Sequence, residues 1–144
     1  MSVLRMDDYL AQSVTRRLRV MGASDETTAI DPAVLASLDE AWGEGEPDLV
    51  AELIDLYLGD SPQWVEAMRA AAAADDPAAL KRAAHTLKGS SGSLGVRQVA
   101  ETCGLLELSG RGSAARVEEL LQELDREFAT ALAALAAERI RRVA

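Results

Sequence analysis

The chain contains few of the residues from which small catalytic or metal-binding proteins are usually built. Its 144 residues include one cysteine, one histidine and 3% aromatic residues. One cysteine excludes a disulfide within the chain, and one histidine beside it excludes the usual zinc sites with four Cys or His ligands. No apolar stretch is long enough to span a bilayer, and no apolar leader segment is visible near the N-terminus. We therefore expect a cytoplasmic protein that binds no metal, no cofactor and no membrane.

The residues that are abundant favour helices. Hydrophobic residues make up 49% of the chain, which suits a single domain with one core. Alanine and leucine dominate, and apolar residues recur at spacings of three and four, as on the buried face of a helix. Cys103 lies on such a face with Val96, Val99 and Leu106, so we expect a buried thiol.

The apolar spacing predicts one short helix and four long helical segments. The short helix begins at Asp31-Pro32 and ends near Trp42. In the next segment, Ser61-Pro62 either starts a separate helix or kinks a continuous one. Short connections make consecutive helices antiparallel, so we predict an all-α fold, an antiparallel up-down-up-down four-helix bundle with a short extra N-terminal helix. The first three long segments are 48–74, 77–94 and about 96–110, and the last is a long helix after the turn at 110–113, with an apolar repeat from Val117 to Leu135.

The chain divides into two parts. Residues 31–144 contain the predicted bundle domain. Residues 1–30 form an N-terminal extension, in which four apolar residues share one helical face: Leu10, Val14, Leu18 and Met21. This pattern leaves open whether the extension is a tail, an extra packed helix or a contact for a partner.

Charge is unevenly distributed along the sequence. The net charge is −9, and residues 31–76 alone carry −11, whereas residues 77–100 carry +4 and no acid. An acidic protein is a poor electrostatic match for nucleic acid. The basic segment therefore fits an acidic protein surface or a phosphoryl group, unless its charges are merely solvated.

His85, the only histidine, lies within this basic segment. On a helix, the apolar stripe of residues 80–94 faces the core, and His85 points about 140° away from it. The residues that share its face are Lys81, Lys88, Gly89 and Gly92. The sequence therefore predicts an exposed imidazole beside two ammonium groups and two positions without a side chain.

Gly89 allows two interpretations. By local rules Lys88 is in the last helical turn, Gly89 follows it as the terminating residue, and residues 89–95 form a loop. Alternatively the helix continues to about Leu94, although each interior glycine costs roughly 1 kcal/mol relative to alanine. The bare positions then form a shallow notch one turn beyond His85, where another protein can approach.

The histidine has few candidate chemical roles. Residues 77–100 contain no carboxylate, cysteine or second histidine, so we expect neither a metal cluster nor a nucleophile–base pair, and hydrolysis is not indicated. A neutral imidazole nitrogen is a nucleophile at neutral pH. Phosphoryl transfer depends mainly on positioning and charge stabilisation, but a metal and an acidic acceptor are missing, so a partner must supply them.

The stretch His85-Thr86-Leu87-Lys88-Gly89-Ser90-Ser91, followed by Leu94-Gly95 and by residues 103–107, resembles the histidine-containing phosphotransfer (HPt) domain family over about residues 32–140. The resemblance implies that His85 is phosphorylated, that Lys88 assists it electrostatically and that Gly89 permits close docking of a receiver domain. It also implies a single helix kinked near Pro62. From the basic face we add Lys81, Arg82 and Gly92 to the residues expected to contact the partner.

The resemblance further implies a phosphorelay intermediate, a phosphocarrier without kinase activity of its own. It takes a phosphoryl group from a receiver aspartate and passes it to another response regulator, with magnesium held by the receiver; a hybrid sensor kinase is a further expected partner. We expect a monomer. A histidine kinase dimerisation helix is disfavoured, because Thr86 stands where an acidic residue typically follows the histidine. The remaining alternative is a helical adaptor or inhibitor that carries no phosphoryl group.

Overall fold

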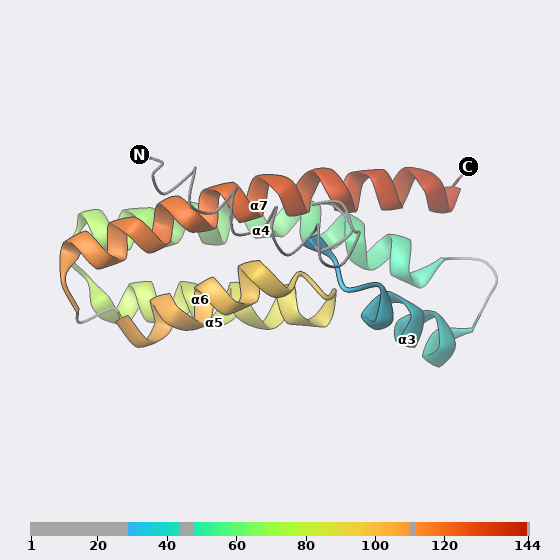
Figure 1. Ribbon diagram of the computed structural model, residues 1–144, viewed down its shortest axis with the longest axis horizontal. Helices are drawn as coiled ribbons and strands as arrows, with labels where there is room; N and C mark the ends of the chain where they lie inside the picture. Colours follow the sequence, from blue (N-terminus) through green and yellow to red (C-terminus); the bar gives the residue numbers. More distant parts are fainter. Residues whose placement is uncertain (1–28, 44–47, 110–111, 144) are drawn as a thin grey trace, which may run out of the picture.

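The computed structural model describes residues 29–43, 48–109 and 112–143, and these residues form five helices and no strand. The all-α prediction is confirmed. The helices are α3 (Pro32–Trp42), α4 (Leu49–Ala73), α5 (Pro77–Ser93), α6 (Arg97–Ser109) and α7 (Ala114–Val143), shown in Figure 1. None of the described helices is long and apolar enough to cross a membrane.

Aspartates begin three of these helices. The side chains of Asp31, Asp48 and Asp76 each accept a hydrogen bond from a backbone N–H in the first turn, at 3.0 to 3.1 Å. These bonds satisfy donors that have no partner within the helix. The predicted starts of α3, α4 and α5 are thereby confirmed.

Helix α4 passes through Pro62 without a break, so the alternative of two separate helices is wrong. Proline removes one backbone donor from a helix interior. The residue before the proline is Ser61, whose buried hydroxyl donates a hydrogen bond to the Tyr57 carbonyl oxygen at 2.5 Å. A side chain thus adds a hydrogen bond to the helix backbone in the turn before Pro62.

The four long helices surround one core. In the described structure α4 packs against α5 and α7, and α6 packs against α5 and α7. Consecutive long helices run in opposite directions, and α3 lies at the end of the bundle near the start of α4 (Figure 1). Since α5 and α7 occupy opposite corners, the outer faces of these two helices point to different sides of the molecule.

The core is aliphatic with few polar groups. The Tyr57 hydroxyl forms a 2.7 Å hydrogen bond with the Ser91 hydroxyl, which joins α4 to α5, and burial raises the pKa of Tyr57 to about 12. Cys103 is buried as predicted, and burial raises the pKa of its thiol to about 12.

Ala29 and Ile30 are also buried in this core. The apolar face predicted for residues 10–21 lies outside the described residues.

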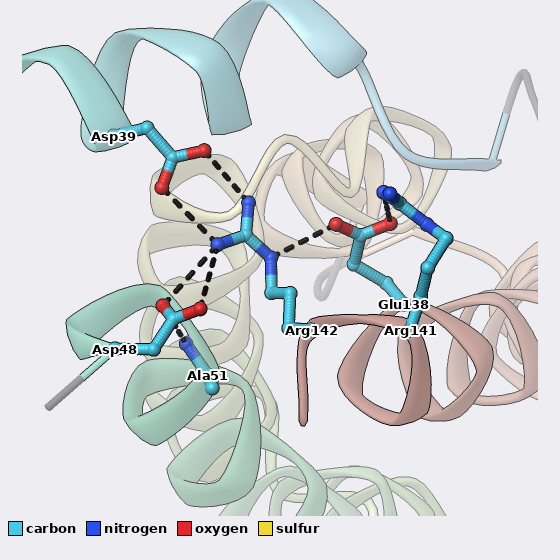
Figure 2. Close-up of polar contacts among 6 residues, drawn as sticks. All are labelled: Asp39, Asp48, Ala51, Glu138, Arg141 and Arg142. Atoms are coloured by element: carbon cyan, nitrogen blue, oxygen red, sulfur yellow. Dashed lines mark hydrogen bonds and ion pairs between the residues drawn. The ribbon is translucent and has the colours of Figure 1, made fainter. Parts of the chain in front are cut away.

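An arginine near the end of α7 ties α3 to the bundle. The Arg142 guanidinium contacts Asp39 of α3 at 2.8 Å, the α4 cap Asp48 at 3.2 Å and Glu138 at 2.8 Å (Figure 2). The pKa of Asp39 is lowered, chiefly by its hydrogen bond to Arg142, and that of Asp48 chiefly by its bond from the Ala51 N–H. This cluster was not predicted, because Asp39 and Asp48 are far from Arg142 in the sequence.

Candidate functional site

The helix that carries His85 continues past both glycines. Helix α5 runs through Gly89 and Gly92 to Ser93, so the interpretation of residues 89–95 as a loop is wrong. The turn comes later, at Gly95, whose φ is 79°. A Cβ at Gly95 would lie 3.0 Å from Val34 and 3.1 Å from the Asp31 carbonyl oxygen. Glycine is therefore required where the start of α3 rests on the α5–α6 turn.

The predicted face of α5 is open to solvent. Leu80, Ala84 and Leu87 are buried, whereas His85, Lys81 and Arg82 are exposed. Apart from the adjoining residues and backbone of α5 itself, no described atom lies within 4 Å of a Cβ built at Gly89 or Gly92. The surface of α5 at Gly89 and Gly92 is therefore exposed backbone without side chains, which leaves space for a partner beside His85.

A carboxylate from the next helix completes the site. Glu107 of α6 places Oε2 at 2.8 Å from His85 Nδ1 and Oε1 at 2.8 Å from Lys88 Nζ. One carboxylate thus bridges the two residues predicted to carry the chemistry. Residues 77–100 contain no carboxylate, so the sequence argument about the neighbours of His85, which considered only that stretch, did not include Glu107.

The pairing of residues across the α5–α6 hairpin could have indicated the contact between Glu107 and His85. In an antiparallel hairpin, residues equally far from the turn lie side by side. The α5–α6 turn is centred on Gly95, and residues 85 and 107 are ten and twelve positions from it. Glu107 is therefore among the residues that the hairpin brings close to His85.

The electrostatics of the site fix the protons on the imidazole ring. The hydrogen bond from Lys88, and next that from His85, hold the pKa of Glu107 below its usual range. An ionised carboxylate only accepts hydrogen bonds, so the ring nitrogen facing it, Nδ1, is the donor. The other nitrogen, Nε2, then carries the lone pair whenever the ring is neutral. No described residue hydrogen-bonds to Nε2 in the structure.

Lys88 reaches Glu107 across a glycine of α6. A Cβ at Gly104 would lie 3.6 Å from Cδ of Lys88, an ordinary van der Waals distance, so the lysine stem passes directly beside Gly104. A groove beside this contact is lined by both ends of the ion pair and by exposed leucines of α6: Lys88, Glu101, Gly104, Leu105, Glu107 and Leu108. The charged site therefore borders an apolar surface.

Among the described residues, no group of three or more His, Cys, Asp or Glu side chains is arranged to hold a metal ion. The site consists of one imidazole, one carboxylate, one ammonium group and bare helix backbone. This arrangement can present a nucleophilic nitrogen and a nearby positive charge to a second protein.

The comparison with protein families decides what this arrangement is. The model of the Hpt domain family matches residues 52–140, which include both His85 and Glu107. The chain belongs to the Hpt domain family. Phosphotransfer in two-component signalling is therefore its role at the level of the family.

A solved structure gives the same assignment. The crystal structure of histidine-containing phosphotransfer protein B (HptB) from Pseudomonas aeruginosa PAO1 is similar to this chain, with 34% sequence identity and a TM-score of 0.72. The match covers 80% of this Hpt protein and 97% of the other chain. A search of curated proteins found no match.

Proposed function

We propose that His85 is the phosphorylated residue of a phosphorelay intermediate, accepting a phosphoryl group from the aspartate of one receiver domain and passing it to another response regulator. The observation that carries this proposal is the contact of Glu107 with both His85 and Lys88 at 2.8 Å. It orients an exposed imidazole so that Nε2 faces solvent with an available lone pair.

In the proposed reaction, Nε2 of His85 attacks the phosphorus of the aspartyl phosphate. The N–P bond forms as the P–O bond to the aspartate breaks, and the aspartate leaves as a carboxylate. The proton on Nδ1 stays in place, so the phosphorylated ring becomes cationic. Glu107 stabilises that positive charge through the existing hydrogen bond. The reverse transfer to a second receiver uses the same groups.

Lys88 is proposed to stabilise the charge of the phosphoryl group. Its ammonium group is held within one helical turn of His85 by Glu107. The phosphoryl oxygens carry negative charge next to His85, and the nearby ammonium group stabilises that charge electrostatically. Lys88 thus has a preset position from which it can turn toward the phosphoryl group.

The receiver is proposed to dock over α5, contacting Lys81, Arg82, Lys88, Gly89 and Gly92. All five lie on the exposed side of α5 around His85. The receiver supplies the aspartate and the magnesium ion, and this chain supplies neither a cofactor nor a kinase activity. We further propose that α4–α7 form an up-down-up-down bundle with α3 as an extra helix, and that the protein works as a monomer bound to neither nucleic acid nor membrane.

The test is phosphoryl transfer from purified receiver domains. The chain is mixed with magnesium and a panel of phosphorylated receivers, and acid-labile, base-stable phosphate is followed on wild type and His85→Gln. We expect labelling of wild type only, with equal thermal stability because His85 is exposed. Labelling of His85→Gln would refute the assignment. Binding without transfer to wild type, in a panel known to contain a cognate receiver, would favour the adaptor alternative.

A further inference from the structure

Helix α6 exposes two leucines next to the site. In the described part of the chain, Leu108 is 86% exposed and Leu105 is 43% exposed. The other two exposed residues of this helix, Arg97 and Glu101, are charged, as expected for a helix surface in water. Neighbouring apolar side chains that are exposed beside a polar site are typical of a surface that another molecule covers.

The two leucines are continuous with the charged site. Leu105 and Leu108 line the same groove as Lys88 and Glu107. Leu108 directly follows Glu107 in the sequence, and the carboxylate of Glu107 lies 2.8 Å from Nδ1 of His85. The surface around His85 therefore extends from α5 onto the apolar side chains of α6.

The outer face of α5 offers no large apolar side chain to a partner. The exposed residues around His85 are basic, hydroxyl-bearing or glycine: Lys81, Arg82, Thr86, Gly89, Ser90 and Gly92. Protein interfaces usually have a fully buried apolar centre with polar residues at the rim. Leu105 and Leu108 share a groove with this site, so they can supply the apolar centre that α5 lacks.

The direction of the imidazole favours α6 over α4 as the second helix of the interface. Leu56 of α4 is also exposed, at 61%, but α4 and α6 flank α5 on different sides. The His85 ring is bonded to Glu107 of α6, and His85 lies only about 60° around α5 from Lys88, which also reaches Glu107. A partner that contacts Nε2 of His85 therefore covers the α6 side of α5.

Phosphoryl transfer gives a second reason for apolar cover at this place. Water competes with the intended acceptor for a phosphoryl group, so a docked pair of proteins must exclude water from the reacting atoms. Leu108 lies next to Glu107, and covering it removes water from the edge of the contacts of Glu107 with His85 and Lys88. These electrostatic contacts become stronger when water is excluded.

We propose that Leu105 and Leu108 form an apolar docking strip for the receiver domain, so that the interface spans α5 and α6. The receiver places apolar side chains on the two leucines and acidic side chains beside Lys81 and Arg82. A second copy of this chain is disfavoured as the occupant, because each copy carries a net charge of −9 and two copies repel each other. The inference rests on the proposed function, since its partner is the receiver that exchanges the phosphoryl group with His85.

The test measures receiver affinity and direct phosphorylation separately, on the full chain. The probe for affinity is the receiver domain of the panel that binds wild type most tightly, and the probe for direct phosphorylation is phosphoramidate, a small donor that needs no docking surface. We expect Leu108→Asn and Leu108→Asp to bind the receiver at least about tenfold more weakly than wild type, as for the loss of one buried leucine contact. Leu108→Asn should be labelled by phosphoramidate at the wild-type rate, with unchanged thermal stability because Leu108 is exposed.

Ile140→Asn is the matched control, since Ile140 is 65% exposed on α7, at the corner of the bundle opposite α5. It should bind the receiver with wild-type affinity. Leu105→Asn should weaken binding as Leu108→Asn does, and the Leu108 variants keep the test decisive if Leu105→Asn lowers thermal stability.

Wild-type affinity of both Leu108 variants would overturn the docking strip, while labelling of His85 still supports the proposed function. Weaker binding of Leu108→Asp alone would also overturn it, because the added charge and not the lost apolar contact would then be the cause. Absence of phosphoramidate labelling in wild type would instead count against the proposed function, and the affinities would still decide whether the leucines contact the receiver.

Discussion

Glu107 Oε2 lies 2.8 Å from Nδ1 of His85, across the hairpin of α5 and α6. The partner of the histidine thus comes from a different helix, and its second oxygen is occupied by Lys88. Because both carboxylate oxygens accept hydrogen bonds, this arrangement positions the imidazole ring and the ammonium group at once.

Replacing Glu107 with Gln should slow phosphoryl transfer to His85. A glutamine side chain has one accepting oxygen, so either His85 or Lys88 would face an amide N–H₂ donor instead. The ring would lose its fixed orientation and the cationic phosphohistidine would lose its counter-charge. We expect transfer from a receiver to be slower by about 10- to 100-fold, measured as single-turnover rates with saturating receiver.

The control for Glu107→Gln is Glu101→Gln, which removes an exposed carboxylate of α6 that also lines the groove. It should transfer at the wild-type rate. Equal rates for Glu107→Gln and wild type would show that the carboxylate has no part in transfer. A loss seen only in receiver affinity would place Glu107 in docking rather than in orientation of His85.

Within one helix, the sequence was sufficient to predict much of the site. The exposed side of α5, with His85, Lys88 and the bare glycines, follows from a 3.6-residue period and needs no tertiary information. Glu107 and the Arg142 cluster depend on how helices pair, and Arg142 meets Asp39 from 103 positions away. Patterns within single helices do not contain these pairings, so only hairpin symmetry could have predicted Glu107.

The end of α5 shows why local rules alone were ambiguous. Gly89 looks like a helix terminator because glycine is common directly after helices. The apolar stripe nevertheless continues, since Ser91 and Leu94 are buried beyond it. Burying a leucine contributes about 2 kcal/mol, which exceeds the roughly 1 kcal/mol that an interior glycine costs. Tertiary packing therefore keeps the helix intact past Gly89.

Gly89→Leu should weaken docking of a receiver. The space beside Gly89 is empty, so the new side chain fits the free protein and occupies the surface a partner needs. We expect at least tenfold weaker binding, measured by titration with a receiver, and no loss of thermal stability because leucine favours helix over glycine.

Gly89→Ala is the size control for this variant. It gives a similar gain in helix propensity with a much smaller side chain, so docking should weaken far less than for Gly89→Leu. If wild type, Gly89→Ala and Gly89→Leu bind the receiver equally, the notch has no role in docking.

Arg142→Ala should destabilise the fold more than Arg141→Ala. Arg142 is 13% exposed and contacts Asp39, Asp48 and Glu138, whereas Arg141 is 72% exposed and, among the described residues, forms an ion pair with Glu138 alone (Figure 2). Removing Arg142 leaves three acids near one another without their shared cation. We expect a loss of about 2 kcal/mol in the free energy of unfolding for Arg142→Ala, and less than 1 kcal/mol for Arg141→Ala, measured by urea denaturation. Equal effects of the two variants would contradict a stabilising cluster at Arg142.

Glu127 should make stability depend on pH near neutrality. It is partly buried on α7, where it accepts a 2.6 Å hydrogen bond from the Thr102 hydroxyl of α6. Burial is the main cause that raises its pKa to about 8, and the charges of Glu123 and Glu101 add to the effect. In the unfolded chain a glutamate titrates near 4.3. Between these values the folded state binds the extra proton, so stability falls as pH rises.

We expect wild type to lose about 2 kcal/mol more than Glu127→Gln between pH 6 and pH 8, measured by urea denaturation at both values. Glutamine keeps an acceptor for Thr102 but never ionises, so its stability should change little in this range. Glu118→Gln, which removes an exposed carboxyl of the same helix, should follow the wild-type pH dependence. Parallel pH profiles for wild type and Glu127→Gln would mean that Glu127 is already ionised in the folded protein at pH 6.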